Sequence, residues 1–159
     1  MLIAQGNLAN AYARLGRFEE ALSLRRDVYS ASLKLLGEDD EDTLMEANNY
    51  AVCLVSLRHF EKARSLLRKT MPVARRVFGE ANDLTLKMRW LSARALYKDP
   101  AATLDKIHEA VTALAETERT ARRVLGGANP VTRGIEGDLR EARAALRARE
   151  TPSPPGGEA

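Results

Sequence analysis

Apolar residues recur along the chain with the period of an amphipathic helix. Between positions 21 and 36 they follow a spacing of roughly 3.6 residues, at Ala21, Leu24, Val28, Leu35 and Leu36. The stretch before it is rich in alanine, and Gly16 breaks the pattern ahead of a second helix that we expect to open at Phe18 or Glu19. The pattern therefore predicts two antiparallel helices joined by a short turn.

This helical pair is repeated. A shift of 42 residues places Asn7 on Asn49, Phe18 on Phe60 and Gly37 on Gly79. Self-similarity with a period of about 20 to 50 residues is typical of stacked supersecondary units, because each unit buries its apolar face against the next. The repeat predicts a solenoid.

A recurrent string joins the units. Residues 74–86 read ARRVFGEANDLTL, residues 121–133 read ARRVLGGANPVTR, and a looser copy, LKLLGEDDEDTL, covers residues 33–44. Arginines suit the negative end of a helix dipole, and a glycine suits a left-handed C-terminal cap. The glycines are Gly37, Gly79 and Gly126, and Asp40, Asn82 and Asn129 follow as N-caps of the next helix. The string predicts helix end, turn and helix start.

The third unit is longer, because its string follows the previous one after 47 residues rather than 42. We place the five extra residues around 98–106, with a helix start at Asp99 and Pro100 that makes the second helix of this unit the longest of the protein. The stripe of Ile135, Leu139, Ala142 and Leu146 then predicts a capping helix.

The expected fold is all-α, a right-handed α-solenoid of about three antiparallel helix pairs with a C-terminal capping helix. The repeat domain spans 1–149, with units of about 1–40, 41–82 and 83–129 and the capping helix at 130–149. Residues 150–159, rich in proline and glycine, are expected to be a disordered tail. An apolar content of 45% with only 5% aromatic residues fits this helical class.

The pattern within a unit resembles the tetratricopeptide repeat (TPR). Small residues precede Gly16, and Phe18, two acidic residues and Ala21 follow it. The 42-residue spacing and the linkers LGEDDEDTL and FGEANDLTL resemble the kinesin light chain type of this repeat. Asp40, Asn82 and Asn129 replace the family histidine, and Arg58 replaces the glycine of the first unit. The heptads that would join a motor are absent from the sequence, so the resemblance implies the repeat fold and not motor attachment.

The resemblance also implies a binding surface, since the first helices of successive repeats line a concave groove. The positions that match are Asn7, Asn10, Arg14, Met45, Asn48, Asn49, Val52, Lys87, Trp90, Arg94, Tyr97 and Lys98, with Ile3, Gly6, Val55, Ser56 and Leu91 beside them. Asn7 and Asn49 match the asparagine that holds a ligand backbone in peptide-binding members.

Basic side chains in the groove favour an acidic segment or a terminal carboxylate as ligand. They are Arg14, Lys87, Arg94 and Lys98. Trp90 and Tyr97 lie seven residues apart and could anchor an apolar ligand residue. The alternative is that Trp90 packs between units and that the lysines are ordinary solvated surface.

Other chemistry is not indicated. Cys53 aligns with alanines and is expected to fill a small buried slot, and His59 and His108 lack a second ligand at metal spacing. We expect no catalytic residue, no metal, no cofactor and no enzyme activity, because neither a phosphate-binding loop nor a nucleophile motif is present. A net charge of +3 from 25 basic and 22 acidic residues, interleaved along the chain, does not favour nucleic acid.

The leading functional hypothesis is a non-catalytic module that binds a protein or peptide, acting as an adaptor or scaffold in the cytoplasm. Neither a small-molecule ligand nor a membrane is expected as partner. The alternative is a structural or regulatory repeat segment of a larger signalling protein. Leu2 corresponds to Leu44, so we expect either that the chain is a fragment of a longer array or that the open face of its first helix meets a partner. A basic nucleic-acid-binding surface is less favoured.

Overall fold

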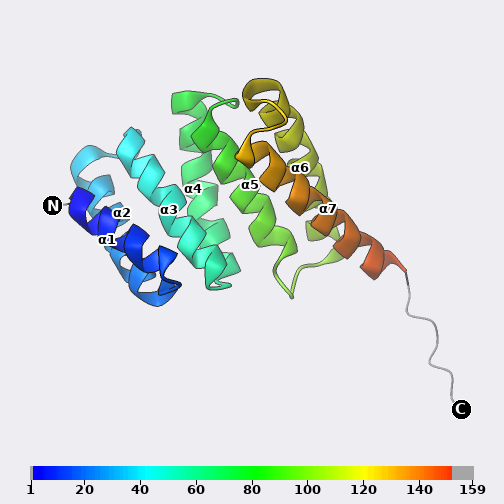
Figure 1. The fold of residues 1–159 in the computed structure, drawn as a ribbon, viewed down its shortest axis with the longest axis horizontal. Coiled ribbons are helices and arrows are strands. Elements are labelled where there is room, and N and C mark those ends of the chain that lie inside the picture. The colour runs from blue at the N-terminus through cyan, green and yellow to red at the C-terminus, as the bar shows by residue number, and fades with distance from the viewer. Residues whose placement is uncertain (1, 152–159) are drawn as a thin grey trace, which may run out of the picture.

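The computed structural model describes residues 2–151, which form seven α-helices and no strand. The helices are α1 (Leu2–Arg14), α2 (Phe18–Leu36), α3 (Glu41–Ser56), α4 (Phe60–Phe78), α5 (Asp83–Tyr97), α6 (Leu104–Leu125) and α7 (Pro130–Glu150). Each helix packs against the next along the chain, and α3 also contacts α5 as α5 contacts α7. The odd-numbered helices form one layer and the even-numbered helices a second layer behind it (Figure 1). The predicted all-α solenoid of helix pairs is confirmed.

The repeated string forms the turn between units, as predicted. Asp40 caps α3 by accepting the backbone N–H groups of Asp42 and Thr43. Asn82 and Asn129 cap α5 and α7 in the same way, each accepting the N–H two residues on at 2.9 Å. The three glycines before them have φ between 85° and 92°, which a side chain disfavours. These turns fix the register of one unit on the next.

The core lies along the seam between the two layers. Leu44 and Ala51 of α3 pack with Leu67 and Ala74 of α4. In the third unit the corresponding Leu86 and Ala93 of α5 pack with three buried residues of α6, which are Ile107, Ala110 and Leu114. Alanines at the closest approaches let the helices pack tightly, because each is fully or almost fully buried.

The start of α6 differs from the prediction. α5 ends at Tyr97, and a turn of residues 98–103 precedes α6, whose N-cap is Thr103. Asp99 does not start the helix, because its carboxylate accepts the Ala101 N–H at 2.9 Å and pairs with Arg64 at 3.0 Å, which closes a turn instead. The extra residues are shared between this turn and α6. With 22 residues, α6 is the longest helix of the described chain, as predicted.

The last helix covers the third pair. Ile135, Leu139 and Ala142 of α7 are buried in the same core as α5 and α6, and Leu146 packs at its edge. The helix runs to Glu150, and the predicted disordered tail lies almost entirely outside the described residues. Pro72 lies inside α4 without ending it. None of the helices described is both long enough and apolar enough to span a membrane.

Candidate functional site

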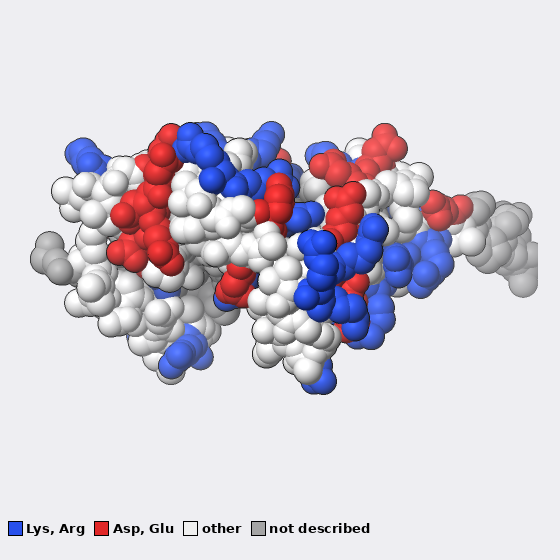
Figure 2. All heavy atoms as spheres, turned by 90° about the horizontal axis from the view of Figure 1, so that it is seen from above, with Lys and Arg blue, Asp and Glu red and all other residues white. Residues whose placement is uncertain are grey.

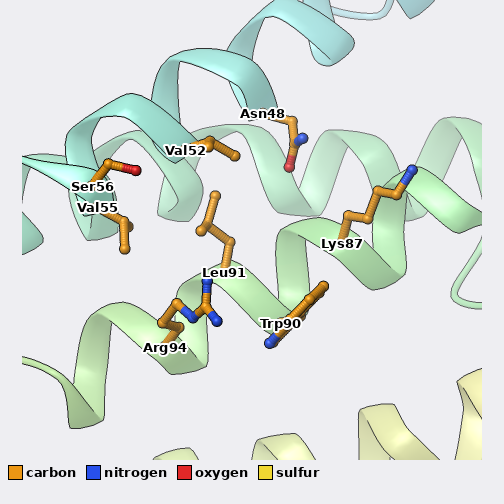
Figure 3. Close-up of a pocket in the computed structure, with 8 residues that line it drawn as sticks. All are labelled: Asn48, Val52, Val55, Ser56, Lys87, Trp90, Leu91 and Arg94. Atoms are coloured by element: carbon orange, nitrogen blue, oxygen red, sulfur yellow. The ribbon is translucent and has the colours of Figure 1, made fainter. Parts of the chain in front are cut away.

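A hollow opens between α3 and α5 on the odd-numbered layer. Its lining residues are Asn48, Val52, Val55, Ser56, Lys87, Trp90, Leu91 and Arg94. All eight belong to the groove set expected from the sequence, so the structure brings these positions together around one space (Figure 3). Val52 is 44% exposed and Leu91 is 7% exposed, so the hollow has an apolar floor and rim.

Asn48 is the buried polar side chain in the lining of this hollow. Its side chain comes from α3 and is 9% exposed, and its Oδ1 is buried without a hydrogen-bond partner. In Figure 3 the amide oxygen points into the space enclosed by Val52, Leu91 and Lys87. A buried carbonyl oxygen without a donor costs about 1–3 kcal/mol, so Asn48 stands ready to accept a hydrogen bond from a group that enters the hollow.

The wall opposite α3 is held in place by α7. The indole Nε1 of Trp90 donates to Asp138 Oδ2 at 2.6 Å. The guanidinium of Arg94 donates to both oxygens of the same carboxylate, at 2.7 and 3.0 Å. The Asp138 side chain is only 5% exposed. Its hydrogen bonds, followed by its charge, raise the pKa of Arg94 against the opposing effect of burial.

Trp90 is therefore a fixed wall and not a free anchor. Its ring packs on Gly134 of α7, and the Arg94 guanidinium lies 5.2 Å from the ring centroid. The sequence left open that Trp90 packs between units, and its contact with α7 is packing of that kind. The same ring also lines the hollow.

Of the four basic side chains expected in the groove, all but Arg14 pair with an acidic side chain among residues 2–151. Lys87 Nζ lies 2.5 Å from Asp83 Oδ2 on its own helix. Arg94 pairs with Asp138, and Lys98 pairs with Glu141 of α7. The hydrogen bond from Lys98 lowers the pKa of Glu141 below its usual value. The field of the groove is thus weaker than the count of its lysines and arginines predicts.

A second hollow lies between α1, α2 and α3. Four of the predicted groove residues line it, which are Asn7, Asn10, Met45 and Asn49, together with Ile3 and Gly6. Asn10 is already engaged, because its Oδ1 accepts from Arg25, which also pairs with Glu46 at 2.7 Å. Arg25 is only 3% exposed, so this polar network forms the buried back of the second hollow.

Three predicted site residues lie outside both hollows. Arg14 is exposed at the end of α1, and Lys98 is the exposed C-cap of α5. Tyr97 is 7% exposed and packs in the core of the third pair, with its hydroxyl donating to Glu141 at 3.2 Å. Burial, together with the Asp138 carboxylate, raises the pKa of Tyr97 above its usual range. The interpretation of Tyr97 as a ligand anchor is wrong, because α7 covers it.

Asp138 is the residue that the sequence analysis missed. It sits between Ile135 and Leu139 on the buried stripe of α7, and a carboxylate in such a stripe is rarely unpaired. That interruption is the signal that could have pointed to a buried partner on α5.

The single cysteine of the chain, Cys53, is a buried thiol. Cys53 is 3% exposed, and burial raises the pKa of its thiol, which disfavours the reactive thiolate. In the part of the chain that the structure describes, no group of three or more His, Cys, Asp or Glu side chains could hold a metal ion.

Comparison with known proteins supports the repeat fold. The family model of the tetratricopeptide repeat matches residues 1–76, which hold most of the first two helix pairs. A solved structure of nearly identical TPR-like repeats of kinesin light chain type from Podosopora anserina has a TM-score of 0.79 at 20% identity, covering 94% of this chain and 68% of that one. BtubC (BKLC) from P. vanneervenii has a TM-score of 0.60 at 19% identity, covering 99% and 68%. No curated protein matches the sequence.

These matches confirm the resemblance drawn from the repeat pattern. The fold is that of a helical-repeat solenoid. Residues 1–76 match the tetratricopeptide repeat, and the fold resembles TPR-like repeat structures of kinesin light chain type. This repeat generally mediates protein–protein interaction.

Proposed function

We propose that the hollow between α3 and α5 binds an extended segment of a partner protein without catalysing a reaction. The observation that carries this proposal is the unpartnered Oδ1 of Asn48, buried in the lining of a hollow whose floor and rim include Val52, Val55 and Leu91. A peptide N–H is the donor that an extended segment offers at every residue, so one asparagine can hold its backbone without reading its side chains.

The apolar lining selects the side chain that enters. Val52, Val55 and Leu91 leave room for one apolar ligand residue, and the rigid ring of Trp90 closes one side. A wall that is already fixed loses little entropy on binding, which favours affinity. The ligand is therefore an extended segment with an apolar anchor residue.

Charge at the rim adds a second preference. The Lys87 side chain is 42% exposed, and among residues 2–151 it pairs with Asp83 alone, one turn earlier on the same helix. An exposed pair of this kind contributes little, about 0.3–0.5 kcal/mol, so a ligand carboxylate can replace Asp83 at small cost. We infer that the preferred segment carries an acidic residue or its terminal carboxylate close to the apolar anchor.

The test is a selection of linear peptides from a displayed random library on the folded protein. The affinity of recovered peptides is then measured by fluorescence polarisation for wild type, Asn48→Ala and Asn49→Ala. The resemblance to peptide-binding repeats points to Asn49 instead. It is the neighbouring residue of the same helix but lines the other hollow, so Asn49→Ala distinguishes the two assignments. The proposal expects a loss of about tenfold for Asn48→Ala, equivalent to one backbone hydrogen bond, and little change for Asn49→Ala. Equal affinities in all three proteins would refute it.

A further inference from the structure

The first helix of each unit carries apolar or aromatic residues at the same three positions. The positions are i, i+7 and i+10, and they are Leu2, Ala9 and Tyr12 in α1, Leu44, Ala51 and Leu54 in α3, and Leu86, Ala93 and Leu96 in α5. In α3 they are at most 1% exposed, because α4 packs on them. These three positions form the pairing stripe of a unit.

In α7 the pairing stripe consists of arginines. The turn between units aligns Thr85 with Thr132, both fully buried, so Leu86, Ala93 and Leu96 correspond to Arg133, Arg140 and Arg143. All three arginines are exposed, and none makes an ion pair with any residue between 2 and 151. The face that receives a second helix in the other units is therefore present in α7, with its apolar groups exchanged for positive charge.

A shallow hollow continues this face onto α6. Arg140 and Arg143 line it together with Leu139, Ala115 and Arg119. Leu139 is 8% exposed and gives the hollow a small apolar floor between the arginine stems. Figure 2 shows Lys and Arg side chains gathered toward the C-terminal end of the molecule, with acidic side chains among them.

We propose that α7 receives an acidic amphipathic helix of a partner protein, at the place that the second helix takes in the preceding units. Its carboxylates would meet Arg133, Arg140 and Arg143, and its apolar stripe would cover Leu139. An apolar helix cannot pack here, since it would bury three guanidinium groups without partners. A helix with glutamates on both flanks satisfies them through charge-assisted hydrogen bonds.

The surroundings favour a protein helix over a nucleic acid. Glu118 and Glu136 lie in the same hollow, where they pair with Arg122 and would repel a phosphate chain. The residues that line the hollow include no aromatic side chain on which a base could stack. Discrete carboxylates on a helix can avoid these two glutamates, whereas a continuous polyphosphate cannot.

The experiment titrates the folded protein with a designed amphipathic helix of 19 residues, the length of α4. One peptide carries leucines on its apolar stripe and glutamates on both flanks, and a second carries lysines in place of the glutamates. A single-stranded oligonucleotide of thymidines is the third probe. Fluorescence anisotropy gives the affinity of each.

Two variants with equal charge change are compared. The first combines Arg133→Gln, Arg140→Gln and Arg143→Gln, and the second combines Lys34→Gln, Lys62→Gln and Lys69→Gln, which are exposed lysines of α2 and α4. Circular dichroism confirms that both variants fold. The proposal expects the glutamate helix to bind wild type and the lysine variant alike, and the arginine variant at least about tenfold more weakly.

Three results would overturn the proposal. The first is equal binding of the glutamate helix to both variants. The second is preference for the lysine helix or for the oligonucleotide. The third is self-association of the protein that the arginine variant abolishes, since this would assign the face to a second copy of the chain.

Discussion

Asp138 of α7 accepts the indole N–H of Trp90 of α5 at 2.6 Å, so the last helix of the solenoid holds the wall of the candidate groove. The same carboxylate receives two hydrogen bonds from Arg94, which also lines the groove. The capping helix therefore shields the third pair and also fixes the shape of the groove. We therefore expect the stability of α7 and the proposed binding between α3 and α5 to be coupled through this carboxylate.

Replacement of Asp138 by alanine tests how much this carboxylate contributes to stability. We expect Asp138→Ala to lower the free energy of unfolding by about 2 kcal/mol, because Trp90 loses its acceptor and Arg94 its partner. Arg94 is 38% exposed, so water offsets part of the loss. Urea unfolding followed by circular dichroism gives the value. The control is Glu20→Ala, which breaks the exposed pair of Glu20 with Arg17 and should cost much less. Equal losses would contradict the account.

Two glycines of α7 should respond oppositely to the same substitution. A Cβ at Gly134 would lie 2.6 Å from Cζ2 of Trp90, whose ring Asp138 holds in place, whereas a Cβ at Gly137 would meet nothing within 4 Å. Gly137→Ala should stabilise the protein by roughly 0.5–1 kcal/mol, the ordinary gain of alanine over glycine within a helix. Gly134→Ala should destabilise it by about 1–3 kcal/mol through overpacking. Thermal unfolding of the two variants shows whether each substitution raises or lowers stability. A higher melting temperature for Gly134→Ala would show that Trp90 moves freely.

The turns between units should be sensitive to backbone strain alone. Gly79 has φ 85° and ψ 168°, a region that side chains avoid, although a Cβ there would touch nothing within 4 Å. Gly79→Ala is therefore expected to lower the free energy of unfolding by about 1–3 kcal/mol. Ala81→Ser, in the same exposed turn, is the control and should be close to neutral. Chemical denaturation distinguishes the two, and a neutral Gly79→Ala would argue against the strain.

The turn before α6 should make stability depend on acid pH. The backbone N–H of Ala101, and then Arg64, lower the pKa of Asp99 below its ordinary value. A carboxyl with a lowered folded pKa stabilises the fold above its unfolded pKa of about 3.9, and this contribution is lost as pH falls through the folded value. Melting temperatures of wild type should exceed those of Asp99→Asn at pH 7, and the difference should shrink below about pH 4. A difference that does not change with pH would contradict this assignment.

The helix boundaries and the register of the repeats are predicted well from the sequence, because both depend on interactions between residues that are close along the chain. Asp40, Asn82 and Asn129 cap the helices where the repeated string places them, and the following buried threonines keep one register throughout. Capping requires only a side-chain oxygen two or three residues before its donor, so it is readable from the chain.

The groove is less predictable, because the positions of Trp90 and Arg94 depend on contacts with Asp138 of α7, which lies more than 40 residues later in the chain. Tyr97 and Trp90 share a helix face with the groove positions, yet α7 covers the first and fixes the second. Periodicity shows on which face of its helix a residue lies, but not which other helix packs over that face. The pairing stripe of α7 is different, since its three arginines are visible once the repeats are aligned.

The most direct test of the account uses the single tryptophan of the chain, Trp90, which lines the hollow. Its emission is recorded while wild type and Asn48→Ala are titrated with a peptide selected on the folded protein. The account predicts a saturable change in Trp90 emission for wild type and a midpoint about tenfold higher for Asn48→Ala. Binding that leaves the emission of Trp90 unchanged, with the same affinity in both proteins, would place the partner surface elsewhere.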